Sequence, residues 1–481
     1  MPDPFVVVGG DAAGLSAASK LKRDDPDREV VVFERGQWVS FAHCGMPYYV
    51  EGKVEDLTDL LSLTPEQIED RGIDLRRGHE VVAVSPDDNA VTVEADGERF
   101  DQPYGELLVA TGGRAVAGPF SDALTLDGAF TLHHMDSAAA VRAFLTPPAE
   151  IDPESVDAEF VDRDLVREYA DQTPPDSVAV VGGGYVGVEM AEALSAWDID
   201  VSLFQRDDHV LPAFGPEVGE VVEDHLREQG VSVHTNATVT EILGTDRVTG
   251  VRFDGDVLDV QMALVGVGIR PNTELLDGTG IELGDSGAVA TDEYGCTSHP
   301  DVFAAGDCAE MEHVVSGESV WVPLGLTANR AGRAIGQTVA GDPTLVGTVA
   351  GTAVVKAFDL ETGRSGIIDH EEAREVGFDP VSETVTASSK SGYYPGAAET
   401  TVTLTADRGS SKLLGGSIVG ADTAAKRIDT VATALESGLT VPELERLDLS
   451  YAPPFSPVWD PILVAAKVLN GRLEAEAEDQ P

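Results

Sequence analysis

The sequence has little cysteine and no long apolar stretch. Its three cysteines are Cys44, Cys296 and Cys308, and their spacing contains no C-x-x-C or C-x-x-x-x-C pair that could form a local redox disulfide. No apolar run approaches the roughly 20 residues of a membrane span, and Phe5–Val8 is too short for the apolar core of a signal peptide. We therefore expect a cytoplasmic protein with no membrane partner, in which any disulfide at Cys44 needs a partner from outside the chain.

Positive charge is also scarce. The 481 residues include 32 Lys and Arg against 85 Asp and Glu, a net charge of −53, and only 8 of the basic residues are lysines. So negative a surface disfavours nucleic acid as a partner. The hydrophobic content of 42% argues against a disordered acidic chain. Because molar salt screens self-repulsion, the composition predicts a protein from a salt-loving cytoplasm, with an unusually acidic mesophilic enzyme as the alternative.

The chain opens with a pattern typical of a dinucleotide-binding turn. We expect a strand at 5–8, a helix at 15–22 and a strand at 29–33, with GGDAAG at 9–14 as the turn. The acid that ends the second strand, Glu34, can accept both hydroxyls of an adenosine ribose, while the helix N-terminus faces the pyrophosphate. Asp11 stands where the G-x-G-x-x-G pattern has its middle glycine, so an ordinary β–α turn is the alternative.

A second unit matches the dinucleotide pattern in full, with GGGYVG at 182–187 between an expected strand at 177–181 and an expected helix at 188–197. The next expected strand, at 200–204, is followed by Gln205 and Arg206. An NAD site would have an acid there, whereas a neutral residue followed by arginine accepts a 2′-phosphate, so the pattern favours NADPH over NADH. A shifted register would restore an acid through Asp207 or Asp208. The expected NADPH contacts are Gly182, Gly184, Tyr185, Val186, Gly187, Gln205, Arg206 and Gly268.

Two further segments indicate a flavin. The run LLVATGG at 107–113 is typical of a buried strand that enters a glycine turn, and DVFAAGD at 301–307 is a strand whose final Asp307 can meet the ribityl chain of a flavin. Two nucleotide folds imply a relay in which NADPH supplies hydride, FAD holds two electrons, and a thiol or disulfide receives them. The expected FAD contacts are Gly9, Gly10, Ala13, Gly14, Glu34, Arg35, Ala110, Thr111, Gly112, Gly306 and Asp307.

The sequence predicts an α/β fold with two Rossmann-like dinucleotide-binding domains and a C-terminal α+β domain. The expected parts are a discontinuous FAD-binding domain at 1–145 and 256–342, an acidic insertion without assigned chemistry at 146–172, an NAD(P)-binding domain at 173–255, and a last domain at 343–481. Within the insertion we expect a short helix near 164–169. In the last domain we expect strands at 351–358, 381–388, 400–405 and 413–419 and a helix at 423–437.

The surroundings of the lone thiol read SFAHCGMPYY at 40–49, and aromatic clusters follow as YYPG at 393–396 and YAPPFS at 451–456. Packed aromatic turns are the ordinary interpretation of such clusters. Together with the S-F-x-x-C-G-x-P-Y-Y run, however, they make nearly the whole chain similar to the coenzyme A disulfide reductases. These form part of the single-cysteine branch of the FAD-dependent pyridine nucleotide-disulfide oxidoreductases, which also contains NADH oxidases and CoA-persulfide reductases.

The resemblance implies that Cys44 forms a mixed disulfide with CoA beside the flavin. It also implies a homodimer in which the C-terminal domain is the dimerisation domain and Tyr393 and Tyr451 reach the active site of the partner subunit. We expect Tyr451 to protonate the released CoA thiolate and Tyr393 to orient the substrate. The residues that align with CoA-contacting positions are Ser16, Lys20, Arg23, Ser40, His43 and Asn329, and His43 departs from the asparagine often found there.

An acidic protein needs a local basic patch to attract CoA, which is itself an anion. We expect Lys20 and Arg23 to bind its phosphates, and Arg76 and Arg77 to be a solvated helix face.

Three other functions stay open. A water-forming NAD(P)H oxidase would use Cys44 as a sulfenic acid, although Arg206 and the tyrosine clusters argue against it. A CoA-persulfide or polysulfide reductase needs almost the same site. A flavin-binding redox sensor would leave the thiol and the tyrosines without a role. Cys296 and Cys308 are expected to be core residues, and no metal-ligand spacing is present.

Overall fold

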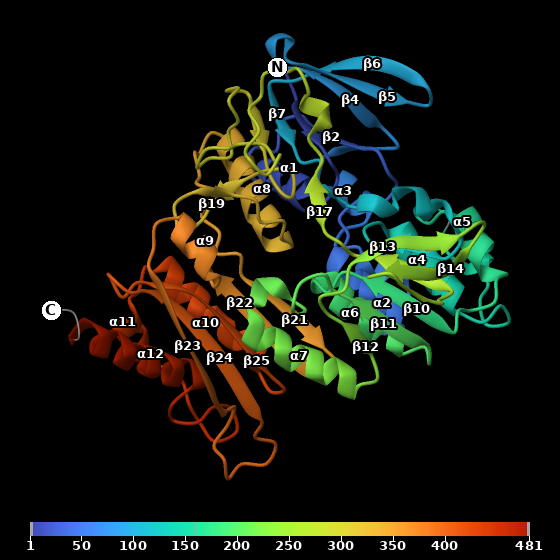
Figure 1. The fold of residues 1–481 in the computed structure, drawn as a ribbon. Coiled ribbons are helices and arrows are strands. Elements are labelled where there is room, and N and C mark those ends of the chain that lie inside the picture. Colours follow the sequence, from blue (N-terminus) through green and yellow to red (C-terminus); the bar gives the residue numbers. More distant parts are fainter. Residues whose placement is uncertain (1–2, 158, 479–481) are drawn as a thin grey trace.

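The computed structural model describes residues 3–157 and 159–478, so Ala158 of the expected insertion and the two ends of the chain lie outside it. Figure 1 shows three lobes: a first lobe at the top in blue and yellow, a second at the right in cyan and green, and a third at the lower left in orange and red. Among the described helices, none combines the length and the apolar character needed to span a membrane.

The first lobe is built on a parallel five-stranded sheet. Its order is β18-β7-β1-β2-β3, with bounds Val302–Ala304, Glu106–Val109, Phe5–Val8, Val30–Glu34 and Asp74–Arg77. Helices α1 (Ala12–Asp24) and α8 (Gly325–Val339) pack against each other. A Cβ on Gly332 of α8 would lie 2.1 Å from the Ala13 carbonyl oxygen, so the helices cross too closely for a larger residue. This crossing fixes α1 and therefore the turn at its N-terminus.

The second lobe repeats the arrangement. Its parallel sheet has the order β12-β11-β10-β16-β9, with bounds Ser232–His234, Asp200–Phe204, Ser177–Val181, Met262–Val265 and Ala129–Thr131. Helices α6 (Tyr185–Ser195) and α7 (Pro216–Glu228) belong to this lobe. The continuous apolar strands are typical of a parallel sheet buried on both faces, and the two predicted Rossmann-like units are confirmed.

The boundaries between these two lobes differ from the expected ones. Strand β16 pairs with β10 and β9, so residues 129–131 and 262–265 belong to the second sheet and not to the FAD-binding domain. The chain crosses between the lobes at the antiparallel pair β8 (Gly113–Ala115) and β17 (Ile269–Pro271). The domain boundaries predicted at 145 and 256 were wrong, because the sequence of a short apolar strand does not indicate which sheet the strand joins.

The third lobe is an antiparallel sheet covered by helices. Its order is β21-β22-β25-β24-β23, with bounds Ala353–Ala357, Leu360–Gly366, Leu413–Gly420, Glu399–Asp407 and Pro380–Ser388. Helices α10 (Ala424–Glu436) and α12 (Pro461–Glu478) pack on it. Sequence patterning missed β22 because LETGRSG has no apolar alternation and two glycines. Gly363 is needed there, since its Cβ would lie 2.9 Å from Ile428 Cβ of α10.

A buried carboxylate joins the third lobe to the second. Glu192 of α6 is 8% exposed and accepts hydrogen bonds from Lys356 Nζ and, at 2.8 Å, from the Phe358 backbone N–H. Lys53 Nζ, just beyond α2 (Met46–Glu51), lies 3.7 Å from the same carboxylate, and α2 packs against α4 (Met135–Leu145) and α6 of the second lobe. Glu192 therefore lies where the second and third lobes meet.

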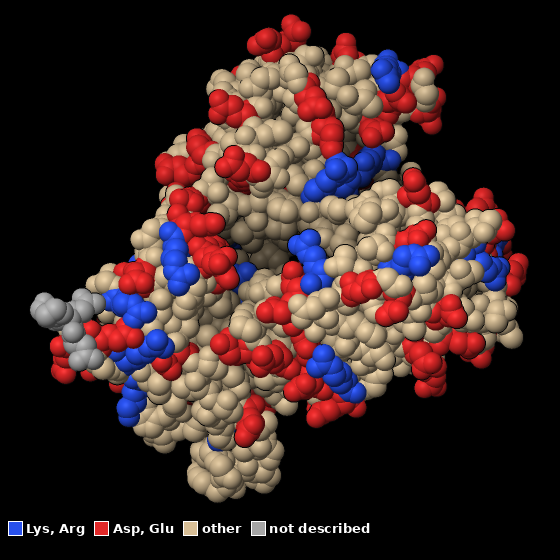
Figure 2. Space-filling view, viewed as in Figure 1, with Lys and Arg blue, Asp and Glu red and all other residues tan. Residues whose placement is uncertain are grey.

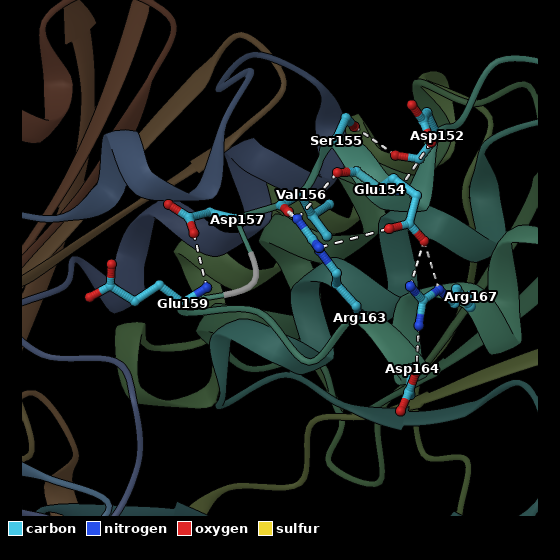
Figure 3. Close-up of polar contacts among 9 residues, drawn as sticks. All are labelled: Asp152, Glu154, Ser155, Val156, Asp157, Glu159, Arg163, Asp164 and Arg167. Atoms are coloured by element: carbon cyan, nitrogen blue, oxygen red, sulfur yellow. Dashed lines mark hydrogen bonds and ion pairs between the residues drawn. The ribbon is translucent and has the colours of Figure 1, made fainter.

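The acidic insertion is folded and belongs to the second lobe. It contains the 3-10 turn η5 (Pro153–Ser155) and α5 (Arg163–Ala170), which is slightly longer than the predicted helix. Figure 3 shows Arg163 and Arg167 on one side of Glu154, and Arg167 Nε donates to Glu154 Oε1 at 3.0 Å. Exposed ion pairs contribute at most about 1 kcal/mol each. The buried face of the insertion, which packs with α4 (Met135–Leu145), therefore holds it in place.

The insertion also contacts the segment that leads to Cys44. The Phe160 ring lies 5.1 Å from the Trp38 ring, and Arg77 Nη2 lies 2.6 Å from Glu159 Oε1. Arg76 pairs with Asp74 at 2.6 Å. Both arginines therefore lie on strand β3 in ion pairs, and the expectation of a solvated helix face was wrong.

Short elements complete the chain. In the first lobe these are η2 (Leu57–Leu60), α3 (Pro65–Glu69), η3 (Pro86–Asp88), η7 (Glu274–Leu276), β19 (Met311–Glu312), β20 (Ser319–Val320) and the sheet β4-β5-β6 (Glu80–Ser85, Ala90–Ala95, Glu98–Pro103). In the second they are η4 (Gly118–Thr125), η6 (Pro212–Phe214) and the sheet β13-β14-β15 (Val239–Gly244, Val248–Phe253, Asp256–Leu258), and in the third α9 (His370–Glu375) and α11 (Val441–Glu445).

Acidic side chains cover all three lobes. Figure 2 shows them spread over the face in view, whereas Lys and Arg are few and several of them border the hollow where the lobes meet. The net charge of −53 is therefore not confined to the insertion or to a tail.

We expect the thermal unfolding midpoint to rise by several degrees between about 0.1 M and 1 M KCl, because the Debye length falls from about 10 to 3 Å over that range. Circular dichroism would follow the transition. Sucrose at matched osmolality is the control, since it is excluded from the surface without screening charge. An unfolding midpoint unchanged by KCl would contradict the salt-loving interpretation.

Candidate active site

The first glycine turn offers uncapped backbone N–H groups. Helix α1 begins after Asp11, and no side chain caps its first N–H groups. Gly9 has φ +116°, and a Cβ there would lie 2.1 Å from the Ala110 carbonyl oxygen, so glycine is required for β1 and β7 to end side by side. Free N–H groups at a helix N-terminus suit a pyrophosphate. The turn therefore fits the FAD that the sequence predicts.

The predicted ribose-binding position differs between the two lobes. In the first lobe Glu34 accepts from the Gly10 N–H at 2.9 Å and from the Gly36 N–H at 2.8 Å. In the second lobe Gln205 takes the same place and accepts from the Gly183 N–H at 3.1 Å. The two turns are thus closed in the same way, one by a carboxylate and the other by an amide.

Arg206 follows Gln205 and extends into solvent. Its side chain is 81% exposed, and Nε lies 3.5 Å from Asp207 Oδ1. The same Asp207 accepts a hydrogen bond from Gln205 Nε2 at 2.7 Å. A cation and an acid are therefore both available beside the strand end.

The other predicted cofactor residues lie at the same sheet edges. Parallel pairing makes Val8, Val109 and Ala304 end together, so the residues that follow these strands meet at one edge. That edge carries Gly9, Gly10, Ala110, Thr111, Gly112, Gly306 and Asp307, with Ala13 and Gly14 in α1. In the second lobe the edge carries Gly182, Gly184, Tyr185, Val186 and Gly187, and Gly268 lies on the crossover before β17.

Cys44 lies in the 3-10 turn η1 (His43–Gly45), directly before α2. A Cβ at Gly45 would lie 2.3 Å from Leu60 Cδ2, so the turn sits tightly on its neighbour. The thiol is exposed. Desolvation and then the Glu189 carboxylate raise the pKa of Cys44 above its ordinary value. Glu189 comes from α6, which packs against α2, so the second lobe contributes directly to the electrostatics of the thiol.

Glu189 itself is poised to exchange a proton. Burial, and then the neighbouring Glu192, raise the pKa of Glu189 to about 7, while Lys356 opposes the shift. Glu189 is therefore largely neutral below pH 7 and negative above it.

Asp11 forms a pair with His43, the residue before Cys44. Asp11 Oδ2 lies 3.0 Å from His43 Nε2, and Asp11 Oδ1 accepts from the Phe41 N–H at 3.1 Å. Burial raises the pKa of Asp11 to about 7, and burial with His133 and His134 lowers the pKa of His43 to about 4. Because burial disfavours both charges, the pair favours a protonated carboxyl beside a neutral imidazole. The middle position of the glycine turn thus carries a group that loses its proton near pH 7.

Two further histidines, His133 and His134, lie beside this pair. The His43 ring stacks on Phe41 at 4.2 Å and meets His133 edge-on at 5.5 Å, and His133 Nε2 lies 2.8 Å from the Gly113 carbonyl oxygen. Burial, then His133 and then Arg35 lower the pKa of His134. The exposed Arg35, predicted as an FAD contact, thus lies near the histidines.

The predicted CoA contacts gather along one face of α1. Ser16 Oγ donates to Asn329 Oδ1 at 2.6 Å, and the Ser40 N–H donates to the Gly10 carbonyl oxygen at 3.0 Å. Lys20 pairs with Asp24 at 2.5 Å, and Arg23 Nε donates to the Ser19 carbonyl oxygen at 3.2 Å. The two cations therefore lie at the far end of the helix from Cys44, each with a partner in its own helix.

The predicted tyrosines lie on loops of the third lobe. The first tyrosine loop, residues 389–398, carries Tyr393, and the second tyrosine loop, residues 451–456, carries Tyr451. Their side chains are 80% and 61% exposed. Figure 1 shows the loop between β23 and β24 at the lower end of the molecule, away from α2 of the same chain, the helix that follows Cys44. The structure does not bring these tyrosines to Cys44 within one subunit.

Protein-family comparison accounts for both parts of the chain. Residues 3–327 match the model described as pyridine nucleotide-disulphide oxidoreductase, and residues 352–461 match the dimerisation domain of the same proteins. The chain belongs to the pyridine nucleotide-disulphide oxidoreductase family. This confirms an FAD-dependent oxidoreductase with the predicted class of fold.

Relatives of known name include two kinds of sulfur reductase and an NADH oxidase, the last from Methanocaldococcus jannaschii at 30% identity over 96% of this chain and 97% of the relative. The chain is 36% identical to the NAD(P)H coenzyme A polysulfide/persulfide reductase of Pyrococcus horikoshii, over 98% of this chain and 99% of the relative. It is 29% identical to the coenzyme A disulfide reductase of Staphylococcus haemolyticus, over 94% and 96%. The solved NAD-dependent persulfide reductase from A. fulgidus superposes with a TM-score of 0.89 at 31% identity, covering 98% of this chain and 84% of that one.

Sequence reasoning missed Glu189, His133 and the side chain of Asp11. A signal for Glu189 was available, because Glu189 and Glu192 lie three residues apart in an otherwise apolar helix. Such a pair costs free energy in a core unless it has a role. Nothing in the sequence marked His133, since its contact with His43 joins distant parts of the chain.

We expect Glu189→Gln to make Cys44 more reactive toward iodoacetamide above pH 7, because removing the carboxylate lowers the pKa of the thiol. The rate should rise about two- to fivefold in the reduced, flavin-loaded enzyme, since the thiolate is the nucleophile. Below pH 7, where Glu189 is largely protonated, the two rates should converge.

Glu168→Gln is the matched control, since Glu168 is exposed on α5 and far from the thiol in the sequence. Equal alkylation rates of wild type and Glu189→Gln at pH 8 would contradict the assignment.

Proposed function

We propose that this protein is an NADPH-dependent reductase of CoA disulfide, which acts through a mixed disulfide between Cys44 and CoA. The observation that carries the proposal is a single exposed thiol at one end of α1 with two cations at the other. Residues 12 to 23 span about 16 Å at 1.5 Å per residue. A substrate with a thiol at one end, phosphates at the other and an extended arm between them suits this spacing.

The bound groups supply the redox chemistry. When bound, FAD takes a hydride equivalent from NADPH and returns two electrons to the sulfur at Cys44. The residues that would hold it are the α1 N-terminus, Glu34 and Asp307. Burial raises the pKa of Asp307 to about 6, so it can both donate and accept hydrogen bonds near neutral pH.

The proposed reduction of CoA disulfide has two steps. The Cys44 thiolate attacks one sulfur of CoA disulfide, forms the Cys44–CoA disulfide and expels a CoA thiolate, which takes a proton. Two electrons and a second proton then cleave the mixed disulfide, return the Cys44 thiolate and release a second CoA thiol. In the proposed homodimer the partner subunit's Tyr451 supplies the proton to the leaving thiolate, and the partner subunit's Tyr393 orients the substrate.

A second candidate is CoA-persulfide reduction, which the names of the Pyrococcus relatives favour. Here Cys44 would attack the CoA-bound sulfur of CoA persulfide, form the same mixed disulfide and expel hydrosulfide. The two reactions differ only in the first leaving group. The NAD(P)H oxidase alternative needs a sulfenic acid at Cys44 instead. The NADH oxidase of Methanocaldococcus jannaschii supports it, at a lower identity than that of the Pyrococcus horikoshii relative.

Mass spectrometry of the purified protein tests the proposal. We expect a mass on Cys44 equal to one CoA in disulfide linkage, removed by NADPH, and two CoA thiols formed per NADPH from CoA disulfide. With CoA persulfide, one CoA thiol and one sulfide per NADPH would accompany the second candidate. A sulfenic acid on Cys44 together with oxygen consumption would instead favour the oxidase.

We expect Arg206→Glu to lower kcat/KM for NADPH by about tenfold or more relative to NADH. A charge-assisted hydrogen bond to the 2′-phosphate contributes about 1.5–3 kcal/mol, and glutamate would repel that group. Steady-state assays with each nucleotide measure the ratio. Arg252→Glu, on strand β14, is the control for the loss of one exposed arginine. An unchanged ratio would remove Arg206 from the nucleotide site.

A further inference from the structure

Arg427 on α10 bonds to both tyrosine loops at once. Its Nη2 donates to the Ser389 carbonyl oxygen at 2.7 Å, at the start of the first tyrosine loop. The same nitrogen donates to the Phe455 carbonyl oxygen at 3.0 Å, near the end of the second tyrosine loop. One guanidinium thus connects two segments that lie some sixty residues apart in the sequence.

The remaining nitrogens of Arg427 are also engaged. Nε donates to Asp460 Oδ2 at 2.9 Å, and Nη1 donates to Thr423 Oγ1 at 2.6 Å and to the Asp422 carbonyl oxygen at 3.1 Å. The arginine side chain is 10% exposed. Arg427 is therefore a buried cation whose three nitrogens all donate hydrogen bonds, and these bonds fix the orientation of the guanidinium.

The anions around Arg427 close the loops as well. Ser389 Oγ donates to Asp422 Oδ2 at 2.8 Å, and the Ser389 N–H donates to the Ala398 carbonyl oxygen at 2.8 Å, which closes the first tyrosine loop at its base. Ser456 Oγ donates to Asp460 Oδ2 at 3.2 Å, at the end of the second tyrosine loop. Asp422 and Asp460 thus bind the same two loops that the arginine binds.

The bases of the loops are fixed, whereas their tips are exposed. Tyr393 and Tyr451 extend from these bases with most of their surface uncovered. We infer that Arg427 is a positioning residue for the active site of the partner subunit: it sets the spacing of Tyr393 and Tyr451 before they meet the partner's Cys44. This inference rests on the proposed function, in which the two tyrosines act across the dimer.

Lysine cannot replace this arginine. A guanidinium presents its donors in a fixed planar fork, whereas an ammonium is a point charge on a flexible stem. A lysine at 427 would keep the charge near Asp460 but could not hold both loop carbonyls at defined angles. Arg427→Lys therefore keeps the positive charge and removes the planar arrangement of donors, so it tests the geometry alone.

Subunit complementation tests the inference. Heterodimers of a Cys44→Ser subunit and an Arg427→Met subunit, isolated with two different tags in FAD-loaded form, contain one site with Cys44 and intact tyrosine loops from the partner. We expect the heterodimer to have about half of the wild-type activity on CoA disulfide. The Arg427→Met homodimer should lose about ten- to a hundredfold in kcat, because small misplacements of reacting groups are costly.

A parallel heterodimer of Cys44→Ser with Tyr451→Phe distinguishes failure of the inference about Arg427 from failure of the proposed sharing of tyrosines between subunits. If this pair recovers half activity and the Arg427→Met pair does not, the inference about Arg427 is overturned and the shared site stands. If neither pair recovers, the proposed sharing of tyrosines fails, and the inference with it. Full activity of the Arg427→Met homodimer would also overturn the inference.

Three controls keep the result interpretable. Flavin reduction by NADPH should be unchanged in the Arg427 variants, since it does not need the tyrosines. Arg427→Lys serves if Arg427→Met does not fold, and it should show the same pattern of complementation. Lys426→Met is the matched control, because Lys426 neighbours Arg427 on α10 but is exposed and pairs only with Asp429 at the surface.

Discussion

The buried carboxylate of Glu192 is the contact on which the arrangement of the second and third lobes depends. It accepts hydrogen bonds from Lys356 and from the Phe358 backbone of the third lobe, and it lies near Lys53 beside α2. Glu192 is buried, so removing its partners would leave its charge unpaired, which costs free energy. Because α2 follows Cys44 and packs against α6, which carries Glu189, the same region holds the thiol near an acid that raises its pKa. The position of the thiol is therefore a property of the assembled lobes and not of the loop alone.

The surroundings of Cys44 are less negative than the composition suggests. Burial raises the pKa of Asp11, Glu189 and Asp307 to about 7, 7 and 6, so these acids carry protons close to neutral pH. The acids exposed on all three lobes give the protein its large net charge. Burial is the main cause of the difference between the two groups of acids, since a buried carboxylate loses the hydration that favours its charge. Near pH 7, partial protonation of these acids thus reduces the negative charge beside Cys44, while Lys20 and Arg23 lie at the far end of α1.

Much of the fold followed from local patterns. The strands Phe5–Val8, Ser177–Val181 and Asp200–Phe204 were predicted with the bounds that the structure has, because short β-branched runs next to glycine turns have few other interpretations. Strand β22 was missed, since its polar and glycine residues are selected by the packing of α10. The assignment of β9 and β16 to a sheet was wrong for a related reason: pairing partners lie far away in the sequence, and apolar strands of similar composition can join either sheet. The insertion at 146–172 was recognised as acidic, but its buried face against α4 and Trp38 could not be foreseen.

Short stretches of sequence were enough to predict the kind of chemistry. They contain two glycine turns for two dinucleotides, one thiol without a cysteine partner, and Gln205 followed by Arg206 at the second ribose position. These features are local, so a few neighbouring residues suffice to specify them. Which groups lie in contact depends on the tertiary structure. It placed Glu189 against Cys44, joined Asp11 to His43, and connected the two tyrosine loops through Arg427. Such contacts depend on helix crossings and strand order, which no short stretch of sequence contains. The protonation of the acids depends on burial, and the acids are buried only once the lobes have packed.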